Sequence, residues 1–260
     1  MFNIETYLSY SRKPENIPDL IAVIGESVRN NSKIKNAGHE SEKEFIETLT
    51  WSIRDGEQAV STEELSGNFD EANIKSEIIE TMNKCKKLVS VENTTITVFP
   101  TFSNFVKKEM GGVSGFTPDK NIMNIFVCKN YEKESLVQTV AHEYAHTISY
   151  NFISPKTLMD SILLEGLAEV FSEKITGHQS QFSKKISETE AMELFKTLPL
   201  DKEGWDEVRE LFTGGKKYPL WAGYSISYYL IKKYIAENNI DIEELLLEEP
   251  MKIISKIKTY

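Results

Sequence analysis

One short pattern, His-Glu-x-x-His from His142 to His146, constrains the fold more than any other feature of the chain. It lies in a segment whose periodicity predicts a helix over about residues 132–150. Four residues turn a helix by about 400°, so the two histidines project from one face, one turn apart. Two imidazoles placed in this way can bind one Zn²⁺ ion. The fold must then bring a further ligand to this face.

The alternative is a pair of ordinary histidines on an amphipathic helix. The chain has only 4 histidines, and half of them stand in this pentapeptide, which favours the metal site. Glu143 is rotated by about 100° from His142 along the helix. This glutamate is therefore displaced from the ligand position, but it can hydrogen-bond a water molecule on the metal.

Glu165 is the candidate for the third ligand. It stands among apolar residues of a second predicted helix, about residues 155–176, and 18 residues separate it from His146. Burial of a carboxylate there is costly unless it is paired or binds a metal. The alternative is a solvated surface charge. Gly166 has no side chain, which predicts a close approach of the second helix to the first.

Three further polar residues, Glu169, His39 and His178, bear on this site. Glu169 lies one turn beyond Glu165 and can accept the outer N–H of a ligand histidine, or it is a plain surface acid. His39 and His178 stand in polar, glycine-containing stretches and are expected to be exposed.

The rest of the chain predicts an α+β protein, mostly helical, with a small mixed or antiparallel sheet. Residues 1–90 have helical spacing and form the predicted N-terminal region. Residues 91–128 predict the sheet, because β-branched runs there flank a glycine-rich stretch. Helices follow to the end, so the second predicted domain is 91–260. Further helices are expected at about 187–197, 203–212, 221–237 and 241–257.

The motif residues resemble those of a known class. His142-Glu143-x-x-His146 followed by Glu165 resembles the gluzincin zinc metallopeptidases, and the segment around Glu165 looks like the second-helix motif of their aminopeptidase N-like branch. The chain is most similar to the bacterial predicted Zn-dependent protease family of unassigned function. The likeness covers about residues 94–235. It implies a zincin-like metallopeptidase domain that acts on peptides or proteins.

Residue by residue, the resemblance implies His142, His146 and Glu165 as zinc ligands and Glu143 as the general base. It also implies a tyrosine that stabilises the oxyanion. Tyr224 is the candidate and Tyr218 the runner-up, although the related enzymes place their tyrosine where Leu220 stands here. The alternative is a tyrosine that only packs in its helix.

A second departure concerns the substrate's amino group. The aminopeptidase branch has a Gly-x-Met-Glu-Asn segment whose glutamate holds that amine, whereas the corresponding stretch, 110–115, carries no acid. We therefore expect an endopeptidase rather than an aminopeptidase. An exposed strand edge near 112–116 can pair with an extended peptide, or the stretch is a glycine-rich hairpin of no functional weight.

Composition limits the partners. A formal net charge of −10 repels nucleic acid and anionic lipids, and no apolar stretch is long enough for membrane insertion. Cys85 and Cys128 fit no paired metal spacing and predict two small core thiols in a cytoplasmic protein. Two other functions stay open: a non-catalytic zinc-binding scaffold or chaperone-like protein, and hydrolysis of a non-peptide amide or ester.

Overall fold

The structure is a computed structural model that describes residues 2–10, 12–31, 36–66 and 68–260. The chain divides into two compact units, Met1–Glu143 and Tyr144–Tyr260, and the division falls inside helix α6 (Lys133–Ser149). Helices predominate and the strands form one small sheet, which confirms the α+β class. The proposed domain boundary near residue 90 stays a prediction.

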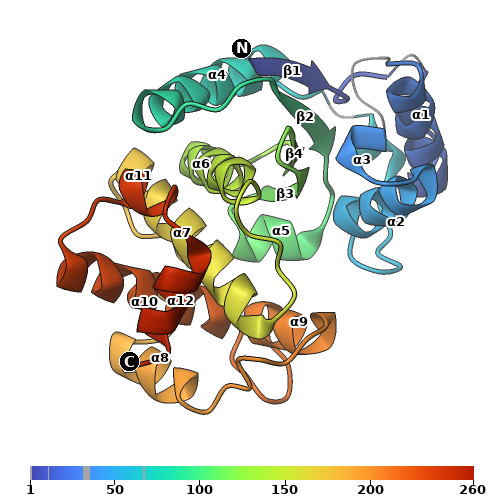
Figure 1. Ribbon diagram of the computed structural model, residues 1–260. Helices are drawn as coiled ribbons and strands as arrows, with labels where there is room; N and C mark the ends of the chain where they lie inside the picture. Colours follow the sequence, from blue (N-terminus) through green and yellow to red (C-terminus); the bar gives the residue numbers. More distant parts are fainter. Residues whose placement is uncertain (1, 11, 32–35, 67) are drawn as a thin grey trace. The chain divides into compact units, whose positions relative to one another are not determined.

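The first unit is built around a sheet with the strand order β1-β2-β4-β3 among the described residues (Figure 1). Its strands are β1 (Phe2–Thr6), β2 (Thr94–Pro100), β3 (Val113–Asp119) and β4 (Ile122–Val127). β1 and β4 both run parallel to β2, and β3 pairs antiparallel with β4. The sheet is therefore mixed. The prediction that residues 1–90 are helical was wrong for β1, whose pairing partner lies about ninety residues further along the chain.

Both faces of the central strands β2 and β4 are buried, so apolar residues occur on both faces of each strand. One face carries Phe99 and Phe126, which belong to a core cluster with residues of the N-terminal helices. On the other face, Gly115 and Thr117 of β3 contact α6 at Glu143. The remaining helical elements of this unit are α1 (Ile17–Arg29), η1 (Asn36–Gly38), α2 (Glu42–Ile53), α3 (Thr62–Leu65), α4 (Glu71–Leu88) and α5 (Asn104–Glu109).

The two cysteines are buried in this unit, as predicted. Burial raises the pKa of the Cys85 thiol to about 12 and that of Cys128 to about 11. Both thiols are therefore protonated and unreactive near neutral pH.

His39 is buried with 6% of its surface exposed, so the expectation that it is exposed was wrong. Its ring packs against Phe45 and Phe116, and Glu44 Oε1 lies 3.7 Å from Nδ1. Burial lowers the pKa of His39 from the usual 6.5, and the carboxylate of Glu44 opposes this effect without reversing it. A histidine buried in the neutral form binds its proton more readily in the unfolded chain.

The free energy of unfolding is therefore expected to decrease as the pH falls below about 6.5, the unfolded-state pKa of histidine. In His39→Leu this part of the pH dependence should be absent. Denaturant titrations of both proteins at about pH 5 and about pH 7.5 measure the difference. Equal changes with pH in the two proteins would contradict the assignment.

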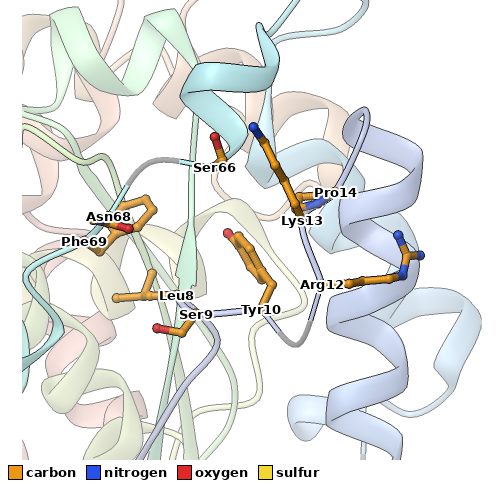
Figure 2. A pocket seen from close by; sticks show the side chains of 9 residues that line it. All are labelled: Leu8, Ser9, Tyr10, Arg12, Lys13, Pro14, Ser66, Asn68 and Phe69. Carbon is orange, nitrogen blue, oxygen red and sulfur yellow. The ribbon is translucent and has the colours of Figure 1, made fainter.

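A pocket of about 390 Å³ lies in the first unit (Figure 2). Its lining residues are Leu8, Ser9, Tyr10, Arg12, Lys13, Pro14, Ser66, Asn68 and Phe69. Arg12 already forms two hydrogen bonds to the carboxylate of Asp19. The described lining residues include no histidine, cysteine or acid, so they offer this pocket neither a zinc ligand nor a carboxylate base.

The second unit consists of helices around α7 (Leu158–Thr176), which packs most extensively on α10 (Ala222–Asn238). Most of α7 is buried, and such a helix is apolar on nearly all sides. The others are α8 (Glu188–Phe195), α9 (Trp205–Thr213), α11 (Ile242–Leu245) and α12 (Pro250–Ile257). The described helices include none that is both long and apolar enough to cross a bilayer.

Two predicted helix boundaries were wrong. α7 begins at Leu158 rather than at Pro155, because Thr157 and Asp160 form a capping box that fixes the first turn. The helix predicted over 241–257 is two helices. Pro250 starts the second of them, since proline lacks an N–H group and is tolerated in a first turn but not inside a helix.

Candidate metal centre

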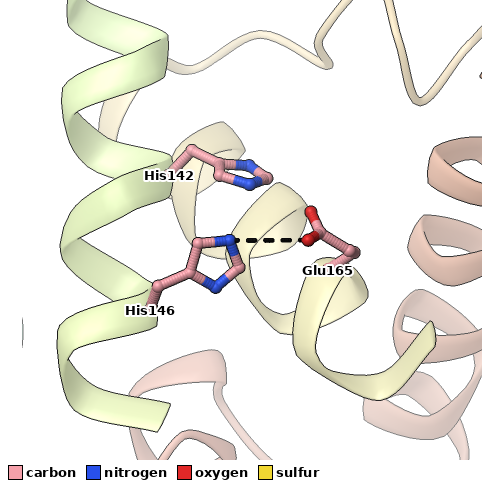
Figure 3. A group of neighbouring side chains, drawn as sticks. All are labelled: His142, His146 and Glu165. Carbon is pink, nitrogen blue, oxygen red and sulfur yellow. Dashed lines mark ion pairs between the residues drawn. The ribbon is translucent and has the colours of Figure 1, made fainter. Parts of the chain in front are cut away.

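His142 and His146 project from the same face of α6, as their spacing predicts (Figure 3). Glu165 reaches them from α7. One ligand atom of each of the three side chains lies within 4.8 Å of the others. His146 Nε2 and Glu165 Oε1 are 3.7 Å apart. The sequence thus identified three side chains that the fold brings together.

The donor set fits a zinc ion. Imidazole nitrogens and carboxylate oxygens bind Zn²⁺ at about 2.0–2.2 Å, and in a tetrahedron such ligands lie roughly 3.3–3.6 Å from one another. The separation of 3.7 Å between His146 and Glu165 is close to that value. His146 is buried and His142 and Glu165 are partly exposed, so solvent reaches one side of the group. Three protein ligands and an accessible fourth position are typical of a catalytic zinc site.

The second helix holds Glu165 in position through its packing. Leu163, Leu164 and Leu167 beside it are buried, whereas the side chain of Glu165 keeps 20% of its surface exposed. The alternative of a solvated surface charge does not describe this environment.

Gly166 allows a close helix contact, but with a different helix from the one predicted. A Cβ atom there would lie 2.5 Å from the main-chain oxygen of Ser227 and 2.7 Å from a side-chain carbon of Ile231, both on α10. The close approach that the sequence assigned to α6 is therefore made by α10. Sequence periodicity gives no information on which helix meets a glycine.

Gly166→Ala is expected to destabilise the chain. A main-chain oxygen cannot move aside without displacing α10, and overpacking of this kind costs roughly 1–3 kcal/mol or more, against about 1 kcal/mol gained in helix propensity. A net loss of about 2 kcal/mol would lower the melting temperature by roughly 4–8 °C.

Gly25→Ala in α1 is the matched control. A Cβ atom at Gly25 would meet only the terminal methyl of Ile46, at 2.9 Å, and that methyl can rotate away. Thermal unfolding followed by circular dichroism compares the two variants. An equal melting temperature for Gly166→Ala and the wild type would refute the packing argument.

Glu143 is buried, with 5% of its surface exposed, and its carboxylate is not one of the three clustered groups. Thr117 Oγ1 donates a hydrogen bond of 2.6 Å to Glu143 Oε2. Sequence reasoning missed Thr117, because the two residues are 26 positions apart and on different elements. The one signal in the sequence was that Thr117 follows Gly115 by two residues in the segment predicted to form the sheet, so that both face the same side of a strand.

A comparison with protein families decides the relationship of the chain. The family described as "Predicted Zn-dependent protease (DUF2268)" matches residues 74–255, which is more than half of the chain. The chain belongs to this family. Comparisons with curated proteins and with solved structures gave no match.

The family's description includes zinc dependence, and the His142, His146 and Glu165 group of this member supplies a suitable donor set. The matched range contains that group, Glu143 and Tyr224, and begins within α4. The description also names proteolysis, as a predicted activity of the family.

Glu169 of this family member is buried with 2% of its surface exposed, so it is not a surface acid. The hydroxyl of Ser180 donates a hydrogen bond to its Oε2. The role as acceptor for a ligand histidine stays a prediction. His178 is exposed, as expected.

The two candidate tyrosines have different surroundings. Tyr224 lies in the first turn of α10, where its ring packs against Phe182 and Phe212 at centroid distances of 5.7 and 5.0 Å. Tyr218 donates a hydrogen bond of 2.8 Å to Glu207. Burial and this carboxylate raise the pKa of Tyr218 to about 12. The hydroxyl proton of Tyr218 is therefore donated to Glu207, and the choice between the two tyrosines stays a prediction.

Proposed function

We propose that this protein is a zinc-dependent peptidase of the gluzincin type that hydrolyses internal peptide bonds. His142, His146 and Glu165 would hold the zinc ion and Glu143 would act as general base. The observation that carries the proposal is the convergence of these three side chains within 4.8 Å, with the carboxylate of the adjacent Glu143 held separately by Thr117. A purely structural zinc site has no use for such a base.

Each side chain has a defined part in the reaction. A zinc ion in this position would acidify a water molecule and polarise the carbonyl group of the substrate. Glu143 takes a proton from the attacking water at its carboxylate and later gives it to the leaving amine. Tyr224 is the proposed hydrogen-bond donor to the oxyanion. Glu169 would orient a ligand histidine from outside the zinc site.

The position of β3 supports an extended peptide as substrate. In the part of the chain that the structure describes, β3 lies at the edge of the sheet and pairs with β4, so its other side can accept a further strand. Ser114, Gly115 and Phe116 are at least partly exposed there. No acid lies in the stretch 110–115, where an aminopeptidase holds the substrate's amine. This absence favours cleavage within a peptide over cleavage at its N-terminus.

The test is incubation of the zinc-loaded full chain with a mixed peptide library, with products identified by mass spectrometry. Internal cuts by the wild type and none by Glu143→Gln or by the chelated protein support an endopeptidase. Removal of single N-terminal residues would instead indicate an aminopeptidase. Zinc binding without cleavage of any peptide would favour a zinc-binding scaffold. Turnover of amide or ester probes alone would favour a hydrolase that acts on non-peptide amides or esters.

A further inference from the structure

The side chain of Glu143 lies against strand β3 at two residues on one face of that strand, Gly115 and Thr117. Successive side chains of a strand point to opposite faces, so residues two apart share a face. Phe116 points to the other face, where its ring stacks on His39. A short segment of one strand is thus the immediate wall for the carboxylate of Glu143.

Thr117 contacts this carboxylate directly. Its hydroxyl oxygen lies 2.6 Å from Glu143 Oε2 and 3.3 Å from the main-chain oxygen of Glu143. The one hydroxyl proton goes to the closer of the two acceptors, the carboxylate oxygen. Thr117 is 2% exposed and Glu143 is 5% exposed, so water competes little for the bond. The hydrogen bond therefore limits rotation of the carboxylate.

Gly115 leaves the space that the same side chain occupies. A Cβ atom at this residue would lie 2.5 Å from Cγ, 2.6 Å from Oε1 and 2.8 Å from Cδ of Glu143. Non-bonded carbon atoms do not approach so closely, and any side chain at this position would displace the carboxylate. The requirement for glycine is one of space, because no left-handed φ is found at Gly115.

We propose that Gly115 and Thr117 are positioning residues that fix the orientation of the Glu143 carboxylate. Thr117 holds Oε2, and the absence of a side chain at Gly115 leaves room for Cδ and Oε1, so the proton of the water would be taken at Oε1. Catalytic groups act best when packing and hydrogen bonds from neighbouring residues hold them within about 0.5 Å of the productive position. The catalytic consequence rests on the proposed peptidase function, whereas the orientation itself does not.

Three variants test the proposal through kinetics. Thr117→Val keeps the shape and removes the donor, Thr117→Ser keeps the donor, and Gly115→Ala adds the displacing methyl. We expect Thr117→Val and Gly115→Ala to lower kcat by roughly 10- to 100-fold, as for a misplacement of about 1 Å. KM and zinc content should stay near the wild-type values. Thr117→Ser, which keeps the hydroxyl and loses the methyl, should have a kcat near the wild-type value. If the threonine acted only through the packing of its methyl, this variant would be impaired as well.

A second measurement does not depend on activity. Melting temperatures of the zinc-saturated full chain are compared for Thr117→Val, Glu143→Met and the double variant. If the two side chains interact, the shift of the double variant should be smaller than the sum of the single shifts by roughly 2–6 °C. Additive shifts would overturn the proposal, as would an unchanged kcat in Thr117→Val. If the shifts of the variants are non-additive but the wild type cleaves no peptide, the peptidase function is refuted. Thr117 would still be supported as the residue that orients Glu143.

Discussion

Glu143→Gln is expected to lower turnover by about 100- to 10,000-fold, the usual contribution of a general base. Glutamine has the shape of glutamate, and its amide oxygen can still accept the hydrogen bond from Thr117. It cannot take a proton from water. The zinc content should be unchanged, because Glu143 is not one of the three clustered side chains. Single-turnover and steady-state assays on a cleaved peptide, with metal analysis of the same sample, give both values.

Glu134→Gln is the matched control for this variant. Glu134 is an exposed acid in the first turn of the same helix, so the same change of charge and shape is made outside the site. It should leave turnover within about twofold of the wild type, as is usual for surface substitutions. Turnover near the wild-type level in Glu143→Gln would remove Glu143 from the mechanism. Loss of zinc in that variant would instead make Glu143 a ligand.

Glu165→Ala is expected to lower zinc affinity by at least about 100-fold. Loss of a hydrogen-bond partner outside a zinc site already costs 10- to 100-fold, and removal of a ligand leaves only His142 and His146 to bind the ion. The protein should lose zinc on dialysis and lose activity with it. Competition with a chromogenic chelator measures the affinity directly, and it needs no substrate.

Glu173→Gln is the control on the same helix. Glu173 lies two turns beyond Glu165 and forms hydrogen bonds to Tyr228 and Lys232 rather than belonging to the clustered group. Glu173→Gln removes one negative charge from α7, as Glu165→Ala does. It should leave the zinc affinity unchanged. Full zinc retention by Glu165→Ala would falsify the ligand assignment, and another carboxylate would have to be sought.

The clustering of the three side chains in the candidate metal centre was predictable from the sequence to the extent that it depends on local geometry. His142 and His146 share a face because both stand on one helix, and the helical period fixes their spacing without reference to the rest of the chain. Glu165 was identified from its apolar neighbours, because a carboxylate in such a segment needs a partner. Helix boundaries were predicted less well, because the capping box at Thr157 moved the start of α7 past Pro155 and Pro250 divided the last predicted helix.

The sheet was less predictable because its pairing is not local. β1 has only five residues, so its alternation of apolar and polar residues is a weak signal, and its strand character depends on the parallel pairing of Phe2–Thr6 with β2. Parallel neighbours of β2 come from both sides of it in the chain, and nothing in the sequence of β2 determines their direction. The burial of His39 likewise follows from contacts with Phe45 and Phe116, which come from two different elements.

The sequence by itself determined the α+β class, the two helices that carry the candidate metal centre and the identity of the three clustered side chains. Only the tertiary structure decided that Gly166 faces α10 and that Gly115 and Thr117 of an edge strand enclose Glu143. The physical reason is the range of the interactions. Helical periodicity depends on residues a few positions apart and can be read from the local sequence. The space around a glycine and the hydrogen-bond donor to a buried carboxylate depend on segments that meet only when the chain folds.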